Sequence, residues 1–466
     1  MYSQSCFEGP WARVQGGLGW AILALTGAVV LVQGGNQPVA WTMMAALVLL
    51  LGAAQLALHL VRNPARALRI ALPLAVIYSC VVSWAVLQAV WPAPPELAHP
   101  AWAAAPEGAV PRISADPGQG VHIALRLATY GLIAWIMAAA SLSNDRAWAY
   151  LRAIGIFSGA YASYGIAAGL SGTNPLLGLD AGGQTHITAS FVNRNHFATY
   201  AGFGMLVNVA LYLHTTQPSD ETKGLNALRN GLETFFSGAW IHALNALLCG
   251  AAVSLSLSRA GGVAAVVGLA VLLGAQRWRG AGGAIACGVV VALLFGVGAF
   301  SLGTGTFNRI LAGGESSAFR FVVYATLIDL IPQRPWLGQG LGAFEDTFRA
   351  HVPLEVSRLE WGNAHSSYLG NAYEMGLPAA AAFYFVLCMV GARLLTGLFV
   401  RRTDRTAPAL ALSVFTLAAA HATVDFSLEI PGVAALFAVL MGLGWAQSFT
   451  RSDRASRAPI EQANRN

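Results

Sequence analysis

Four side chains in the sequence have the types and setting of a site that handles an anion and a proton. His365 lies in NAHSSYLGNAYEMG, Arg194 in FVNRNHFATYAGFG, Arg259 in SLSRAGG, and Arg320 in a segment with apolar residues at helical spacing. A neutral histidine is the usual side chain for taking a proton from a hydroxyl group near pH 7. Guanidinium groups bind a diphosphate through paired, charge-assisted hydrogen bonds. These residues therefore predict an anion site beside a general base.

The elements that must position these residues are membrane helices. The chain has 466 residues, of which 56% are hydrophobic and only 10% are charged, whereas ordinary soluble domains have about 25% charged residues. A soluble protein could not cover so much apolar surface, but a bilayer solvates it. The net charge of +6 is typical of arginines that collect in cytoplasmic loops, so we expect no nucleic-acid partner.

Breaks in the hydrophobicity predict an all-α integral membrane protein with about 12 transmembrane helices. The expected spans are 17–33, 39–60, 70–91, 121–142, 148–170, 196–214, 239–257, 261–276, 282–301, 366–395, 408–424 and 430–449. No small-x-small cleavage site directly follows the first span, so we expect it to stay as a helix. Residues 1–449 form one polytopic membrane domain in this prediction, and residues 450–466 form a disordered cytoplasmic tail.

The arginine-rich loops predict the orientation of these helices. Loops such as 62–69 and 401–405 carry several arginines each, and such loops stay in the cytoplasm, so both termini are expected there. The opposite face carries three longer segments, 92–120, 171–195 and 302–365. The last is the largest, lies between the ninth and tenth helices, and is expected to be partly helical. His365 and the three arginines all fall on this face.

Each of these residues also has a purely structural interpretation. An arginine near a membrane surface can extend toward lipid headgroups or cap a helix end. A histidine at the start of a helix can bind the backbone. The expected position of the histidine and the arginines on one face favours the chemical interpretation.

Several neighbouring polar residues are weaker candidates. Asn193 and His196 flank Arg194 and are expected to contact the same anion. Tyr324 lies one helical turn beyond Arg320. Glu374 follows His365 by about two and a half turns, so no direct contact between them is expected.

His421 and Asp425 are four residues apart. This spacing predicts a shared helical face and a bond between the two side chains. The sequence contains neither an HExxH motif nor a spaced cluster of aspartates. The predicted chemistry is therefore independent of metals and cofactors.

The set of motifs resembles the bacterial O-antigen ligase and polysaccharide polymerase superfamily. FVNRNHFATYAGFG, SLSRAGG, the arginine-bearing loop segment followed by PWLGQGLGAF, and NAHSSYLGNAYEMG occur in the order found in that superfamily, over roughly residues 150–445. The family more often has asparagine after the histidine, where this chain has Ser366.

The resemblance implies a glycosyltransferase on the periplasmic side of a bacterial inner membrane. Its donor would be a glycan on undecaprenyl diphosphate, and its acceptor a hydroxyl group of a glycan or of the lipid A core. Arg194 and Arg259 would hold the diphosphate, Arg320 would bind it or the donor glycan, and His365 would be the general base. Attack at the anomeric carbon would then proceed in one step with inversion.

Four functional alternatives stay open from the sequence. A polymerase passes the growing chain to another lipid-linked repeat unit, whereas an O-antigen ligase passes it to lipid A core; a pilin-glycosylating ligase is a third member. FVNRNHFATY and FSLEIPGVAALFAVLMGLG favour the exopolysaccharide polymerase branch. A transporter or flippase of lipid-linked glycans would need charged residues near mid-bilayer; Arg126 is the main candidate for such a charge.

Overall fold

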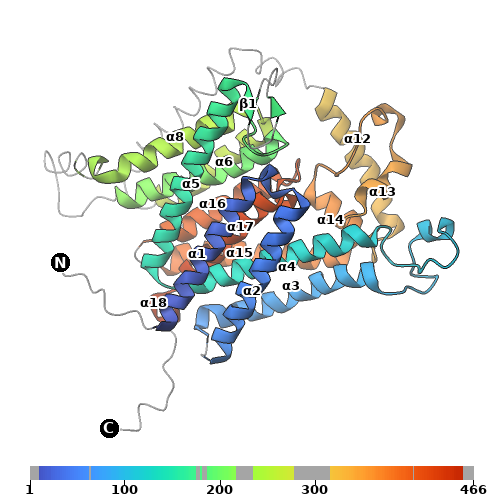
Figure 1. The fold of residues 1–466 in the computed structure, drawn as a ribbon, viewed down its shortest axis with the longest axis horizontal. Helices are drawn as coiled ribbons and strands as arrows, with labels where there is room; N and C mark the ends of the chain where they lie inside the picture. The colour runs from blue at the N-terminus through green and yellow to red at the C-terminus, as the bar shows by residue number, and fades with distance from the viewer. Residues whose placement is uncertain are drawn as a thin grey trace, which may run out of the picture.

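A computed structural model describes residues 10–61, 64–174, 179–180, 186–216, 233, 235–277, 315–401 and 404–454. Almost all of its regular structure is helical (Figure 1). The longer helices are α1 (Pro10–Val30), α2 (Pro38–Val61), α3 (Arg66–Val90), α4 (Pro117–Ala140), α5 (Asn144–Ser171), α6 (Arg194–Thr215), α8 (Trp240–Leu255), α9 (Arg259–Arg277), α12 (Glu315–Leu330), α15 (Leu377–Val400), α16 (Thr406–His421) and α17 (Pro431–Gln447).

Short elements complete the described part of the chain. They are the helices α13 (Phe344–Phe348), α14 (Ser367–Met375) and α18 (Arg451–Arg454), several 3-10 turns, and an antiparallel pair of two-residue strands, β1 (Thr173–Asn174) and β2 (Leu179–Asp180). The all-α prediction is therefore confirmed apart from this small hairpin.

Within the described residues, seven helices are long and apolar enough to cross a membrane, namely α1 to α6 and α15. The apolar helices α8, α9, α16 and α17 are shorter. The protein is thus a multi-pass membrane protein. The expected span 282–301 lies outside the described residues, so the count of twelve stays a prediction.

The tenth expected span, 366–395, differs from the structure because it is broken into α14 and α15. Gly376, between them, has φ +80, a conformation that glycine adopts without steric cost. The PWLGQGLGAF segment packs its backbone against this break, and Gly340 N donates to Glu374 O at 2.9 Å. A Cβ atom at Gly338 would lie 2.3 Å from Glu374 O, so this close approach requires glycine.

The helices have two chemically different ends. We call one the arginine end, since it carries Arg66, Arg146, Arg401 and Arg454. Arginine side chains join several segments there: Arg146 of α5 donates to Ala12 O of α1 at 3.4 Å, and Arg454 donates to Leu142 O, just after α4, at 3.2 Å. We call the opposite end, with residues 91–116, 171–193, 331–366 and 422–430, the loop end.

Two helices at the centre of the bundle are buried almost throughout. Most residues of α6 and nearly all residues of α17 are buried, and α6 packs against α5, α8, α9, α16 and α17. The side chain of Asn193 caps α6 by accepting from Asn195 N at 2.8 Å. Arg194 therefore begins one of these two enclosed helices, at a capped end.

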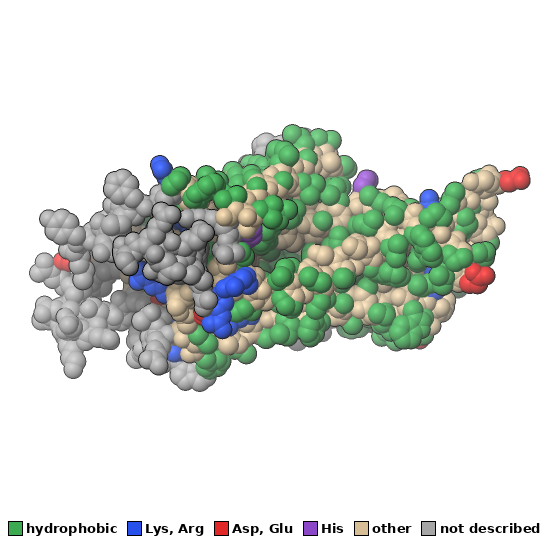
Figure 2. Space-filling model, turned by 90° about the horizontal axis from the view of Figure 1, so that it is seen from below, with side chains coloured by type: hydrophobic (Ala, Val, Ile, Leu, Met, Phe, Trp, Pro, Cys, Tyr) green, Lys and Arg blue, Asp and Glu red, His purple; other side chains and the backbone are tan. Residues whose placement is uncertain are grey.

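The outer helices expose large apolar side chains, as a bilayer requires. Leu50 on α2, Leu72 on α3 and Phe385 on α15 are all more than half exposed. Figure 2 shows hydrophobic side chains across most of one face, with Lys and Arg side chains gathered toward one end and Asp and Glu side chains at the other tip. This distribution fits an apolar belt between two polar ends.

The largest predicted loop contains a small apolar core of its own. Val323 and Leu327 of α12 pack with Phe344, Phe348 and Tyr373. The segment around Arg320, which has apolar residues at helical spacing, forms α12, and Figure 1 shows α12, α13 and α14 together at one side of the bundle. The described part of this loop is therefore partly helical, as predicted.

The tail differs from its expected disorder at its start. Arg451–Arg454 form a helical turn, and Asp453 accepts from Arg66 at 3.1 Å. Arg454 also donates to Gln447 Oε1 at 2.8 Å. These bonds anchor the first residues of the tail to the arginine end, whereas residues 455–466 lie outside the described residues.

Candidate active site

A buried chain of polar side chains joins the starts of two helices at the loop end. Asn195 Nδ2 donates to Asp425 Oδ1 at 2.9 Å, and Ser258 Oγ donates to Asn195 Oδ1 at 2.8 Å. All three side chains are buried. Asn195 directly follows Arg194, and Ser258 directly precedes Arg259. The chain of bonds therefore holds the first turns of α6 and α9 beside each other, and with them the two arginines.

The third arginine reaches the same place from the large loop. Arg320, on α12, donates from one guanidinium nitrogen to Val424 O at 3.2 Å. Val424 precedes Asp425 in the turn between α16 and α17. This turn, residues 422–430, thus contacts the structural supports of Arg194 and Arg259 and the side chain of Arg320 itself.

His365 also lies against this turn. Its ring contacts Phe426 edge-on at a centroid distance of 5.0 Å and Trp361 at 5.7 Å. Tyr324 Oη donates to His365 O at 2.7 Å, so the secondary candidate Tyr324 holds the backbone of the proposed base. His365 has φ +52, a conformation rare for residues other than glycine and found where the surroundings enforce it.

The two ring nitrogens of His365 differ in their surroundings. Nδ1 is buried and has no hydrogen-bond partner in the part of the chain that the structure describes. Burial, together with the nearby Arg320 guanidinium, lowers the pKa of His365 from its usual 6.5 to about 4. The ring is therefore neutral at pH 7.

His421 and Asp425 do not form the pair that their spacing predicts. Helix α16 ends at His421, and Asp425 lies in the following turn, so the two do not share a helical face. His421 Nδ1 instead bonds Thr199 Oγ1 at 2.6 Å, and Thr199 donates to Ser427 Oγ at 3.0 Å. Asp425 also accepts a hydrogen bond from Ser427. These bonds connect α16 to the buried chain of polar side chains that holds the first turns of α6 and α9.

Three other candidates have structural partners. Asn193 caps α6, as described above. His196 is buried, with Nε2 at 3.9 Å from Asp425 Oδ2 and its ring against Phe426. Glu374 Oε1 accepts from Phe344 N at 2.9 Å, which ties α14 to the start of α13. No contact between Glu374 and His365 was expected, and Glu374 supports the loop rather than the base.

Sequence reasoning missed the residues that connect the motifs. Asn195 and Ser258 lie within the quoted motifs, next to Arg194 and Arg259. Their small polar side chains were the sequence feature that could have indicated hydrogen bonds between the motifs. Phe426 gave no signal, because an aromatic residue at a helix end is ordinary in a membrane protein. Its ring lies against both His196 and His365.

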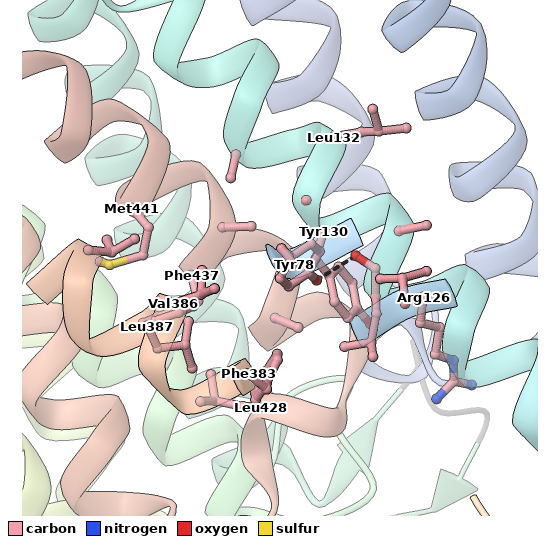
Figure 3. A pocket seen from close by; sticks show the side chains of 18 of the residues that line it. Tyr78, Arg126, Tyr130, Leu132, Phe383, Val386, Leu387, Leu428, Phe437 and Met441 are labelled. Carbon is pink, nitrogen blue, oxygen red and sulfur yellow. Dashed lines mark hydrogen bonds between the residues drawn. The ribbon is translucent and has the colours of Figure 1, made fainter. Parts of the chain in front are cut away.

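A long cavity adjoins this site. It has a volume of about 1380 Å³ and is lined mainly by apolar side chains of α3, α4, α15 and α17. Asn193, His196, Ser367, Glu374 and Phe426 line it at the loop end. Figure 3 shows part of its wall, including Tyr78, Tyr130 and Phe437. Asn193 and His196 therefore stay candidates for substrate contact, through the cavity.

Comparison with known proteins adds an independent observation. Residues 244–384 match the model of the O-antigen ligase family. This match supports the resemblance to the O-antigen ligase and polysaccharide polymerase superfamily. The matched stretch includes Arg259, Arg320 and His365, whereas Arg194 and Asp425 lie outside it. No curated protein matches the chain. The family supports a membrane-bound transferase of lipid-linked glycans, of the ligase or polymerase type.

Proposed function

We propose that the protein is a polysaccharide polymerase of the exopolysaccharide or O-antigen type. It moves a glycan from undecaprenyl diphosphate to a sugar hydroxyl on another lipid-linked repeat unit. The observation that supports this most is the chain of buried bonds through Asp425, because it gathers the supports of Arg194 and Arg259 beside Arg320. Three cations beside a neutral histidine suit a diphosphate leaving group and an attacking hydroxyl.

The proposed reaction is a single displacement. Arg194 and Arg259 bind the diphosphate, and Arg320 binds it or the first sugars of the donor. The acceptor oxygen attacks the anomeric carbon while its proton passes to His365 Nε2. The bond from that carbon to the diphosphate oxygen breaks with its electron pair, so undecaprenyl diphosphate leaves and the configuration inverts. The arginines stabilise the charge that develops on the leaving group.

Donor binding strengthens the base in this proposal. Arg320 contributes to the low pKa of His365. A diphosphate beside Arg320 brings negative charge that offsets the guanidinium, and this raises the pKa of His365 toward its usual value. The histidine therefore accepts a proton more readily once the donor is in place.

The proposed location is the bacterial inner membrane, with the loop end in the periplasm. The described beginning of α1 and the turn α18 both lie at the arginine end. Arginine-rich segments stay in the cytoplasm, so both termini are proposed to be cytoplasmic. Nucleotide sugars are absent from the periplasm, which is why a lipid diphosphate is the expected form of activated donor there.

Transfer in a reconstituted system tests this function. Full-length purified protein is mixed with undecaprenyl-diphosphate-linked repeat units from the host in the presence of EDTA. We expect a ladder of longer lipid-linked glycans. The rate should fall by about 10²–10⁴ in His365→Ala and by about 10²–10³ in Arg259→Ala.

Exposed residues at the same end supply matched controls. His351 is exposed, and Arg349 is exposed in an ion pair with Glu345, so His351→Ala and Arg349→Ala should keep the wild-type rate. Transfer only after lipid A core is added would identify a ligase instead. Movement of intact donor across the vesicle membrane without transfer would identify a flippase, and activity lost in EDTA would contradict a metal-independent reaction.

A further inference from the structure

The cavity has the dimensions of a lipid chain. Its lining residues on α3 run from Leu68 to Ser83, which at about 1.5 Å of rise per residue is about 22 Å of helix. The hydrocarbon core of a bilayer is about 30 Å thick. A mainly apolar cavity that follows a membrane helix over this length fits a hydrocarbon chain better than a glycan.

A buried cation marks one end of this cavity. Arg126 and Tyr130 of α4 both line it. Within the described residues, Arg126 Nε and Tyr130 Oη are buried and have no hydrogen-bond partner, and the Arg126 guanidinium lies 4.7 Å from the ring centroid of Trp41. In Figure 3 this guanidinium lies at the opposite end of the labelled side chains from Met441. A charge held inside a membrane helix marks a functional site by default.

The carboxyl group of Glu429, which acts on Arg126 through its charge, does not cancel this cation. Glu429 lines the same cavity and accepts a hydrogen bond from Ser367 Oγ at 3.0 Å. Burial first, and the nearby Glu374 second, raise the pKa of Glu429 to about 8. Glu429 is therefore mostly uncharged at neutral pH, which leaves positive charge at the loop end of the cavity.

The cavity is distinct from the three arginines of the donor site. None of Arg194, Arg259 and Arg320 lines it. The cavity and the donor site adjoin each other at Phe426, whose ring lines the cavity and lies against His365. A lipid in the cavity can therefore bring its headgroup toward the general base while another diphosphate occupies the three arginines.

We propose that the cavity binds a second polyprenyl diphosphate, the lipid carrier of the acceptor glycan, with Arg126 contacting its diphosphate. The polyprenyl chain lies along α3, α4, α15 and α17, and the acceptor hydroxyl reaches His365 past Phe426. This inference rests on the proposed polymerase function, since a polymerase needs two lipid-diphosphate-linked glycans at once whereas a ligase needs one.

Lipid counting by native mass spectrometry tests the second site without relying on activity. The probe is undecaprenyl diphosphate without glycan, added to full-length purified protein in detergent. We expect two bound copies on wild type, one on Arg126→Gln and one on Arg259→Ala. Because the two sites use different cations, the double variant should bind none.

A pair of adjacent residues tests the shape of the cavity. Ala75 and Val76 of α3 are both exposed, but only Ala75 lines the cavity. Ala75→Trp should fill the cavity and leave one bound copy, whereas Val76→Trp should leave two. Loss of a copy in both variants, or in neither, would overturn the proposal.

The remaining outcomes separate this inference from the proposed function. One copy on wild type, lost in Arg259→Ala and kept in Arg126→Gln, would overturn the second site and leave the donor site standing. No copy on wild type would contradict the proposed function itself. Displacement of the second copy by excess phosphatidylglycerol would show that the cavity takes bulk membrane lipid, which also overturns the proposal.

Discussion

At the scale of single residues, His365 is shaped by groups that lie far from it in the sequence. The ring is held by Phe426, and the backbone is held by Tyr324. Arg320, which lowers the pKa of His365, comes from α12. The type and setting of His365 were sufficient to propose a base. Its backbone conformation and its low pKa were not predictable, because both arise from contacts between distant segments.

The low pKa of His365 predicts an unusual pH profile. Only the neutral ring can accept a proton, so kcat/KM rises with pH below about pH 4 and is constant above it. Between pH 5.5 and 8, kcat/KM should therefore not fall as the pH is lowered. An ordinary histidine would instead give an inflection near pH 6.5. In Arg320→Gln the inflection should move upward, because a positive charge that disfavours the protonated ring is removed.

The measurement is kcat/KM for the donor against pH, for the wild type and Arg320→Gln with the same acceptor, because this quantity reports the protonation of the enzyme before the donor binds. Arg349→Gln, which changes an exposed arginine, is the control and should leave the profile unchanged. A wild-type inflection between pH 6 and 7 would show that His365 titrates as an unburied histidine, in disagreement with its surroundings in the structure.

At the scale of elements, the hydrophobic spans were predictable from the sequence. The break within a span and the contacts between helices were not. Long apolar runs specify helices without tertiary help, and each expected span in the described residues overlaps a helix. The break at Gly376 depends on the PWLGQGLGAF segment packing against it. The bond from Asn195 to Asp425 joins residues 230 positions apart. Local periodicity has no information about such a pairing.

The turn that contains Asp425 should control donor binding. Asp425→Ala leaves the buried donors Asn195 Nδ2 and Ser427 Oγ without their acceptor, which costs about 1–3 kcal/mol. We expect donor affinity to fall by roughly 5- to 150-fold, because the first turns of α6 and α9 lose their connection. Asp425→Asn keeps an acceptor oxygen of the same reach and should recover most of the affinity.

Donor affinity of purified variants, measured together with thermal unfolding, checks this role. Glu345→Ala removes an exposed carboxylate at the same end of the molecule and should change neither quantity. If Asp425→Ala unfolds earlier but binds donor as tightly as the wild type, Asp425 supports the fold without positioning the arginines.

At the scale of the whole molecule, the candidate site residues lie at the loop end, and a long, mainly apolar cavity adjoins them. The sequence predicted the first feature, since the arginine-rich loops and the motif-bearing loops alternate along the chain. The cavity could not be predicted, because its wall is assembled from α3, α4, α15 and α17. Arg126, which the sequence marks as the main candidate for a charge near mid-bilayer, lines this cavity.

The division of roles between the arginines and His365 is tested most directly by measuring donor binding and single-turnover transfer on the same preparations. For His365→Ala we predict wild-type donor affinity with transfer slower by about 10²–10⁴, and for Arg259→Ala weaker donor binding. Wild-type transfer by His365→Ala, or wild-type donor binding by Arg259→Ala, would contradict the site.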